Sequence, residues 1–354
     1  MAKEPGANVG REARHTFGPM STSSPQAPDT AARRVLITDG VDDLLPRGLE
    51  QLGYRIDYEP DIALSEVRER IAEYEGLVIN SKILVDEGLL VRAPRLRWVG
   101  RLGSGLEIVD RPAASARGVA VISSPEGNAP AVGEHALAMV LHLACQLQRG
   151  QRQVMSLQDW DREACRGWEL SERTVGIIGF GHTGPAFARV LRGFGCRVLA
   201  HDKYRSDIES RCPWVKSVDD PDELIARSEV LSLHLPLTQE TRGYLDARRL
   251  ALLPSGAVVI NTSRGLALDL DSLVLALESG RLGGAGLDVF PCEKPATYSS
   301  AERAVMLRLT QLPNVVLTPH VAGWTDKSKR ELAQIILDRV EQLDKTHQTQ
   351  RTSG

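Results

Sequence analysis

The sequence predicts an α/β fold with two parallel sheets, because short apolar strands alternate with amphipathic helices along most of its 354 residues. The strand-like segments fall into two groups separated by a long helix at about 132–148. The first group lies at 35–39, 54–58, 76–80, 97–100 and 119–122. The second group lies at 174–178, 197–201, 229–235, 256–261, 284–289 and 314–318, and a helix to about 343 closes the chain.

A glycine-rich loop marks the start of the second group of strands. Gly179, Gly181 and Gly184 follow a β-branched apolar strand and precede a helix, with the spacing that lets the backbone approach a pyrophosphate. Free N–H groups at the start of that helix favour phosphate binding. Asp202 ends the next strand and can accept hydrogen bonds from an adenosine ribose. This order favours a Rossmann-like dinucleotide site over an ordinary glycine turn.

The order of the two groups predicts that one domain is inserted into the other. We expect a nucleotide domain at 129–319, inserted into a smaller, discontinuous substrate domain built from 34–128 and 320–346. The cleft between two such domains is where small-molecule sites concentrate. Residues 1–32 are rich in Gly, Pro, Ser, Thr and Ala and lack apolar periodicity, so a disordered tail is expected there.

Composition narrows the class of protein. A net charge of −3 argues against a general nucleic-acid or anionic-membrane surface, and no apolar segment is long enough to span a bilayer. The five cysteines show no CxxC pair and no His at ligand spacing, so neither a disulfide framework nor a metal site is expected. These features predict a soluble, cytoplasmic protein.

Three residues that could do chemistry each follow a strand of the second group: Arg264, Glu293 and His320. Each alone has an ordinary explanation, as a surface ion-pair partner, a solvated loop residue or a structural histidine. The carboxyl ends of parallel strands meet at one edge of a sheet, where open α/β sheets bind ligands. Their shared position therefore favours a common site over three coincidences.

Longer stretches of the chain resemble the D-isomer-specific 2-hydroxyacid dehydrogenases over about residues 34–345. The resemblance is carried by Arg101–Asp110, Ser124–Asn128, Gly133–His135, Gly179–Gly184 with Asp202, Leu233–Thr238, Asn261–Gly265, Gly286–Glu293 and Leu317–His320. The chain looks most similar to short-form 3-phosphoglycerate dehydrogenases, and without sequence after Gly354 we expect no C-terminal regulatory domain. The resemblance implies an NAD-dependent oxidoreductase that acts on a small 2-hydroxy or 2-oxo acid and forms a homodimer.

The resemblance also implies roles for single residues. Arg264 would pair with the substrate carboxylate, His320 would take the C2 hydroxyl proton, and Glu293 would orient the imidazole and stabilise its protonated form. Residues expected to contact NAD, with Asp288 on the nicotinamide amide, are Gly179, Gly181, His182, Thr183, Gly184, Asp202, Leu235, Thr262, Ser263, Asp288 and Gly323. Those expected to contact the substrate are Asn80, Ser81, Lys82, Ser104 and Gly105.

Two departures from the family pattern keep alternatives open. The loop Asn80–Lys82 stands where 3-phosphoglycerate dehydrogenases usually carry arginines, so Lys82 is the expected partner of a phosphate. Glyoxylate/hydroxypyruvate reduction is therefore the alternative activity. A nucleotide-sensing, corepressor-like binding protein is the alternative from another class, but the presence of all three chemical residues favours an enzyme. Lys203 and Arg205 beside Asp202 leave room for some use of NADP.

Overall fold

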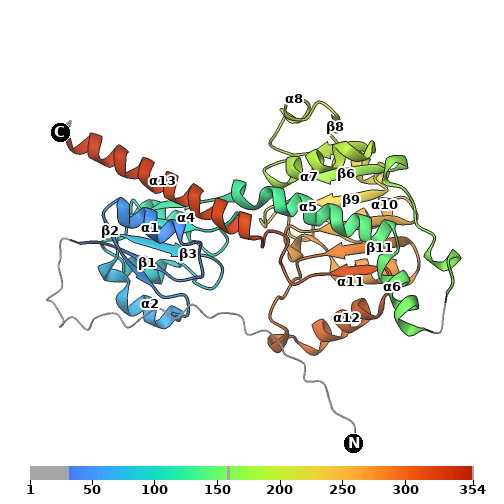
Figure 1. The fold of residues 1–354 in the computed structure, drawn as a ribbon, viewed down its shortest axis with the longest axis horizontal. Coiled ribbons are helices and arrows are strands. Elements are labelled where there is room, and N and C mark those ends of the chain that lie inside the picture. The colour runs from blue at the N-terminus through green and yellow to red at the C-terminus, as the bar shows by residue number, and fades with distance from the viewer. Residues whose placement is uncertain (1–31, 158–159, 353–354) are drawn as a thin grey trace, which may run out of the picture. The chain divides into compact units, whose positions relative to one another are not determined.

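A computed structural model describes residues 32–157 and 160–352 (Figure 1). The expected tail at 1–32 lies, apart from Ala32, outside the described residues. The described part contains one five-stranded and one seven-stranded sheet, and every pair of neighbouring strands is parallel. The predicted α/β fold with two parallel sheets is confirmed.

The first sheet has the strand order β2-β1-β3-β4-β5. Its strands are β1 (Arg33–Ile37), β2 (Tyr54–Tyr58), β3 (Gly76–Ile79), β4 (Trp98–Arg101) and β5 (Ala120–Ser123). They are connected by α1 (Leu44–Gln51), α2 (Leu64–Arg70), a 3-10 turn at Ile71–Glu73, α3 (Glu87–Val91) and α4 (Arg111–Ala116). In the register of the sheet, Val35 lies opposite both Ile56 and Gly76.

The second sheet has the strand order β12-β11-β10-β9-β6-β7-β8. Its strands are β6 (Thr174–Ile178), β7 (Arg197–His201), β8 (Val215–Ser217), β9 (Val230–Leu233), β10 (Ala257–Asn261), β11 (Leu282–Leu287) and β12 (Val315–Leu317). Its helices are α7 (Thr183–Leu191), α8 (Ile208–Arg211), α9 (Pro221–Arg227), α10 (Ala247–Leu252), α11 (Leu270–Glu278) and α12 (Ser300–Gln311). Short 3-10 turns lie at Glu163–Cys165, Leu170–Glu172, Arg192–Phe194, Gly265–Ala267 and Pro295–Thr297. The sequence did not predict β8.

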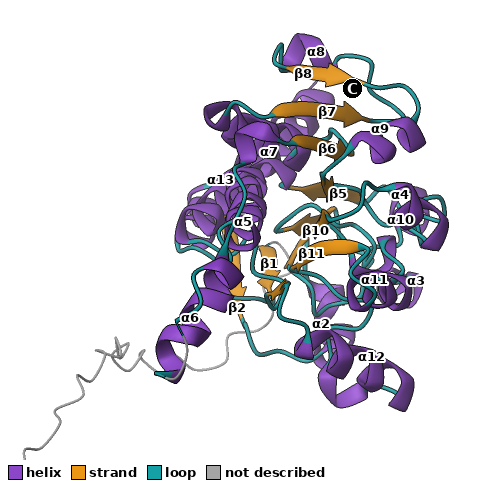
Figure 2. Ribbon diagram, turned by 90° about the vertical axis from the view of Figure 1, so that its right-hand side faces the viewer, coloured by secondary structure: helices purple, strands orange, loops and turns teal. Residues whose placement is uncertain are grey.

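Helices cover both faces of the second sheet, as Figure 2 shows. Strands such as β6 are buried along their whole length, which explains their uninterrupted apolar sequence. Successive side chains of a strand point to opposite faces, so Ile177 and Ile178 enter different hydrophobic clusters. The cluster of Ile177 includes residues of α7 and of the helix before the sheet, whereas that of Ile178 includes residues of α9, α10, α11 and α12.

Two helices connect the sheets where one was expected at about 132–148. Helix α5 (Pro125–Ala144) begins earlier, with Pro125 in its first turn, and α6 (Leu147–Ser156) follows it. Pro125 and Pro130 give the early part of α5 the composition of a loop, although proline is well tolerated at a helix start. The boundary expected between residues 128 and 129 therefore lies within a helix. A Cβ at Gly127 would lie 2.8 Å from the backbone nitrogen of Leu332, so glycine permits close packing there.

The C-terminal helix α13 (Asp326–Thr352) returns to the first sheet. Leu332, Ile336 and Val340 share a hydrophobic cluster with Val35 and other residues of that sheet. No helix in residues 32–157 and 160–352 is long and apolar enough to cross a membrane.

Candidate active site

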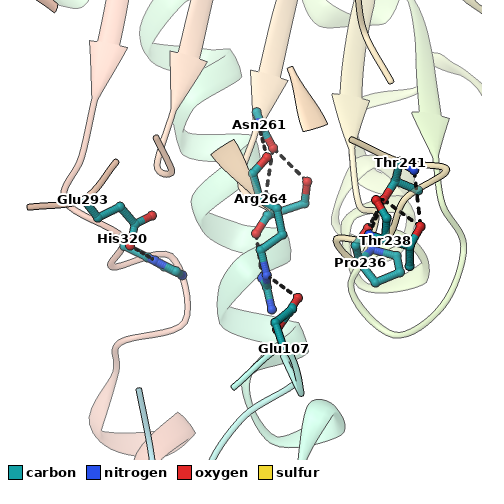
Figure 3. Close-up of polar contacts among 9 residues, drawn as sticks. Glu107, Pro236, Thr238, Thr241, Asn261, Arg264, Glu293 and His320 are labelled. Carbon is teal, nitrogen blue, oxygen red and sulfur yellow. Dashed lines mark hydrogen bonds and ion pairs between the residues drawn. The ribbon is translucent and has the colours of Figure 1, made fainter. Parts of the chain in front are cut away.

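The three predicted chemical residues follow neighbouring strands, since β10, β11 and β12 lie side by side at one end of the second sheet. The Nδ1 atom of His320 lies 2.8 Å from Oε2 of Glu293, and the two side chains point toward one another (Figure 3). The His320 and Glu293 side chains are 50% and 42% exposed, so a ligand can reach them. Burial alone would raise the pKa of Glu293, but the hydrogen bond and charge of His320 hold that pKa below its ordinary value.

The turn that carries Arg264 is built by Asn261, the last residue of β10. The Asn261 side-chain oxygen accepts hydrogen bonds from the backbone N–H and the hydroxyl of Ser263, at 3.0 and 2.8 Å. Its amide nitrogen donates to the carbonyl of Arg264 at 3.0 Å. A Cβ at Gly265 would lie 2.0 Å from the Phe290 carbonyl carbon, so only glycine fits there. These contacts fix the point at which Arg264 leaves the sheet.

Arg264 is paired with Glu107, which lies in the loop between β4 and α4 and which the sequence did not single out. Its Nε donates to Oε1 of Glu107 at 2.9 Å, and one of its terminal nitrogens donates to the carbonyl of Ser263 at 2.7 Å. Burial would raise the pKa of Glu107, but the charge and hydrogen bond of Arg264, aided by the N–H of Leu237, lower it. Glu107 therefore contacts both Arg264 and the loop that follows β9.

A second arginine, Arg101 at the end of β4, lies beside Arg264 and was also missed. Burial and the positive charge of Arg264 lower the pKa of Arg101 to about 10. Its Nε atom is buried, and the described residues offer it no hydrogen-bond partner. Gly103 and Gly105 leave space for the two guanidinium groups: a Cβ would lie 1.6 Å from Arg101 at the first position and 2.1 Å from Arg264 at the second. Two neighbouring, partly desolvated cations favour an anionic ligand.

The residues expected to bind substrate divide between two places. Ser104 and Gly105 lie in the turn between Arg101 and Glu107, next to Arg264. In the other loop, the backbone N–H of Asn80 donates to Asp39 at 2.9 Å, Ser81 is exposed, and the Lys82 ammonium donates to the carbonyl of Pro60. The charge of Asp39 acts on Arg101, so the ends of β1, β3 and β4 face a common region.

The glycine-rich loop has the form that a pyrophosphate requires. Gly179 has φ +92°, and a Cβ there would lie 2.4 Å from the carbonyl oxygen of His234. A Cβ at Gly184 would lie 2.2 Å from the carbonyl oxygen of Gly179, so α7 packs directly against the turn. Gly181 has nothing within 4 Å of its Cβ position, which leaves the loop open to a ligand. The loop therefore fits a dinucleotide.

Other expected cofactor contacts are held in place by the surrounding chain. The Asp202 carboxylate accepts the N–H groups of Phe180 and Tyr204, at 2.7 and 2.9 Å, and remains at the edge of the glycine loop. His182 precedes α7, and burial lowers its pKa. The Thr183 hydroxyl lies 3.1 Å from Nδ1 of His234, whose pKa burial lowers to about 3.

The remaining residues expected to contact the cofactor lie in the loop after β9 and in the first part of the turn after β10. Leu235 reaches toward Gly179, with its side chain 3.3 Å from the Cβ position there. Figure 3 shows the loop folded back by the hydroxyl of Thr241, which donates to the carbonyl of Pro236 at 2.6 Å. Thr262 and Ser263 are 8% and 7% exposed, and the Thr262 hydroxyl has no hydrogen-bond partner among the described residues.

The cofactor contacts expected of Asp288 and Gly323 stay predictions, and the structure shows which other groups these two residues contact. Asp288 is fully buried, and its two carboxylate oxygens accept the backbone N–H groups of Val321 and Ala322, each at 2.8 Å. A Cβ at Gly323 would lie 2.7 Å from the side chain of Asn128, so packing accounts for that glycine. Sequence spacing alone could not reveal that the Asp288 carboxylate faces the backbone.

A cavity of about 390 Å³ borders the Glu293–His320 pair. Its walls are largely apolar and include Phe290, Tyr298 and Met306. Within the described ranges, no cluster of three or more His, Cys, Asp or Glu residues could hold a metal ion. The site thus combines a histidine–carboxylate pair, adjacent arginines and an open glycine loop. These groups are suited to proton transfer, to anion binding and to binding a dinucleotide, respectively.

The chain is similar to proteins whose names agree with this chemistry. Residues 137–322 match the family described as D-isomer specific 2-hydroxyacid dehydrogenase, NAD binding domain. A D-3-phosphoglycerate dehydrogenase of Synechocystis sp. is 32% identical over 308 residues, which are 87% of this chain and 53% of that protein. D-3-phosphoglycerate dehydrogenase 1 of Saccharomyces cerevisiae is 32% identical over 310 residues, 86% of this chain and 65% of that protein.

A solved structure is similar over nearly its whole length. The D-lactate dehydrogenase of Aquifex aeolicus, complexed with NAD and lactic acid, is 29% identical with a TM-score of 0.74, covering 90% of this chain and 98% of that one. The chain therefore belongs to the family of D-isomer specific 2-hydroxyacid dehydrogenases, and the match covers their NAD-binding domain. It spans about half to two thirds of the length of the two curated relatives.

Proposed function

We propose that this protein interconverts a D-2-hydroxy acid and its 2-oxo acid with NAD. The observation that carries the proposal is the 2.8 Å contact between His320 and Glu293, next to the strand end that presents Arg264. A histidine held by a carboxylate is suited to take and return a proton near neutral pH. The D-lactate dehydrogenase that is similar to this chain was solved with NAD and a 2-hydroxy acid, lactic acid.

Each residue of the proposed site would have a separate role in the reaction. Because Nδ1 of His320 faces Glu293, Nε2 is the nitrogen that would exchange the proton of the C2 hydroxyl. Arg264 would hold the substrate carboxylate with its guanidinium, which Glu107 orients through Nε. The N–H groups around Ser104 and Gly105 would complete the carboxylate site. When bound, NAD would accept the hydride from C2.

We propose that the preferred substrate carries a second anionic group, as 3-phosphoglycerate does. Arg101 supports this proposal, because one substrate carboxylate would occupy Arg264, and the neighbouring, partly desolvated Arg101 keeps a buried Nε without a hydrogen-bond partner among the described residues, although its Nη1 donates to the carbonyl of Leu102. Lys82, the cation that the sequence predicted as the partner of a phosphate, would assist in binding this second anionic group. The names of the curated relatives agree with this substrate class. Reduction of glyoxylate or hydroxypyruvate remains the alternative, since neither molecule needs a second cation.

A substrate panel tests both levels of the proposal. The purified protein with NADH should reduce 3-phosphohydroxypyruvate with a higher kcat/KM than hydroxypyruvate, glyoxylate or pyruvate. A preference for glyoxylate would replace the phosphoglycerate assignment with the reductase alternative. No turnover of any 2-oxo acid, despite measurable NADH binding, would favour the corepressor-like alternative.

We also propose that the protein is a homodimer that assembles through the region of α6. Leu147, Val154, Met155 and Leu157 are 54%, 53%, 72% and 91% exposed, which is unusual for a group of large apolar side chains in one segment. Light scattering on the eluting protein would give the mass of a monomer if this proposal is wrong. The inserted nucleotide domain at 129–319 and a cytoplasmic location stay predictions.

A further inference from the structure

We infer that His135, Thr318 and Asp288 form a partly buried hydrogen-bond relay that positions His320, and that His135 and Thr318 are positioning residues for its proton transfer. The inference rests on the proposed function, in which His320 exchanges the substrate proton. It concerns residues to which the sequence assigned no such role. Four observations carry it.

The first observation is the backbone of His320. His320 has φ +56°, the left-handed conformation, which is uncommon outside glycine although histidine, asparagine and aspartate adopt it more often than other residues. Only Gln146 and Leu157 share a positive φ among the non-glycine residues of the described chain. A backbone of this kind persists where surrounding contacts hold it. The contacts that hold His320 are therefore part of how the site is built.

The second observation is that three successive backbone N–H groups converge on one residue. The N–H of His320 donates to the carbonyl oxygen of Asp288 at 2.8 Å. The N–H groups of Val321 and Ala322 donate to its two carboxylate oxygens, each at 2.8 Å. Successive N–H groups around a left-handed residue form a concavity that binds an anion. Here the anion is the Asp288 carboxylate, so the conformation of His320 and the position of Asp288 depend on one another.

The third observation is the bridge from Asp288 to helix α5. The Thr318 hydroxyl donates to Oδ1 of Asp288 and lies 3.1 Å from Nε2 of His135. A hydroxyl has one proton, which Thr318 gives to the carboxylate, so it must accept from Nε2–H of His135. The relay thus has a direction: His135 donates to Thr318, and Thr318 donates to Asp288.

The fourth observation is the position of His135 in the fold. It lies on α5, which packs against α7, the helix that begins at the glycine loop. A Cβ at Gly133, two positions before His135, would lie 2.8 Å from the backbone of Ala186 in α7, so the two helices are in direct contact. The relay therefore connects the segment that carries His320 to α5, which packs against the helix that begins at the glycine loop.

A matched pair of Thr318 variants tests the relay. Thr318→Val keeps the shape of the side chain and removes the hydroxyl, whereas Thr318→Ser keeps the hydroxyl. We expect Thr318→Val to lower kcat by roughly tenfold or more, because small misplacements of a catalytic group can cost up to about a hundredfold. KM for the 2-oxo acid and the Kd for NADH should change little, and the pH profile of kcat should shift. Thr318→Ser should restore most of the loss.

A second substitution and an activity-independent readout keep the test decisive. His135→Phe should reproduce the Thr318→Val effect, while His142→Phe, a change on the same helix, should leave kcat at the parent value. In the ¹⁵N-labelled parent, the relay predicts a slowly exchanging imidazole Nε2–H proton for His135, which Thr318→Val should abolish. Parent-like kcat and pH profile in both Thr318→Val and His135→Phe would overturn the inference. A parent protein without turnover but with that protected proton would instead refute the proposed function.

Discussion

Nε of Arg264 lies 2.9 Å from Oε1 of Glu107. An arginine that follows a strand of the second sheet is therefore held by a carboxylate in the loop after β4 of the first sheet. The terminal Nη2 nitrogen of Arg264 lies next to Gly105 and is left for a ligand. The backbone of Leu237, in the loop expected to face the cofactor, also helps to lower the pKa of Glu107. One carboxylate thus aligns the proposed anion-binding arginine with the proposed cofactor loop.

The first prediction concerns Glu107→Gln. A neutral amide no longer pairs with Arg264, and a hydrogen bond to a charged group is worth about 1.5–3 kcal/mol. We expect KM for the 2-oxo acid to rise by roughly ten- to a hundredfold, with a smaller change in kcat. Steady-state kinetics would show this. Glu69→Gln, an exposed change on α2, is the control. An unchanged KM would mean that Glu107 does not orient Arg264.

The second prediction is the pH dependence of stability that Glu107 confers. Its pKa is lowered in the folded protein, so the folded state favours the ionised carboxylate. Its stabilising contribution is therefore present above the unfolded value of about 4.3 and is lost as the pH falls through the lower folded value. Denaturant unfolding of the parent and Glu107→Gln should give a constant difference in free energy from pH 7 to about 5, and a shrinking one below. A difference that grew on acidification would contradict the shift.

The third prediction addresses the proton-transfer pair. His320→Ala and Glu293→Gln should both lower kcat, the first by about 10²–10⁴-fold, because general acid–base catalysis contributes on that scale. Neither side chain forms part of the core, so NADH binding and the melting temperature should stay near those of the parent. Fluorescence titration with NADH provides the check. Parent-like turnover in His320→Ala would remove the proposed mechanism.

The sequence predicted the residues of the candidate site that directly follow a strand of the second sheet, because each strand and the turn after it form a local pattern. The glycine loop with Asp202, and the positions of Arg264, Glu293 and His320 after their strands, could be read from local patterns. Arg101 and Glu107 were missed because their importance comes from contact with Arg264, which lies 157 positions from Glu107 in the chain. The contacts of the Asp288 carboxylate were not predicted, for a related reason. Its partners are backbone N–H groups, which no side-chain pattern reveals.

The fourth prediction concerns the choice of cofactor. Asp202 lies at the edge of the glycine loop, where its charge should repel a 2′-phosphate and bind a free ribose hydroxyl. The parent should therefore show a higher kcat/KM with NADH than with NADPH, and Asp202→Ala should narrow the difference. Lys203 and Arg205 remain in the variant to attract the phosphate. Equal kcat/KM for the two cofactors in the parent would contradict the assignment.

The fifth prediction asks which cation recognises a second anionic group on the substrate. Arg101→Met keeps the apolar stem and removes the guanidinium beside Arg264, so it should lower kcat/KM for 3-phosphohydroxypyruvate by roughly ten- to a hundredfold. Glyoxylate reduction should change little, because glyoxylate carries only the carboxylate that Arg264 holds. Arg92→Met, an exposed change at the end of α3, is the matched control.

Lys82→Ala separates the two candidate cations. The Lys82 ammonium bonds the carbonyl of Pro60, so a loss in this variant smaller than that in Arg101→Met would assign the main contact to Arg101. A loss confined to Lys82→Ala would return the role to the loop after β3. If Arg101→Met impaired glyoxylate and the phosphorylated substrate equally, Arg101 would act on the carboxylate site as a whole, and the proposed second anionic group would lose its support.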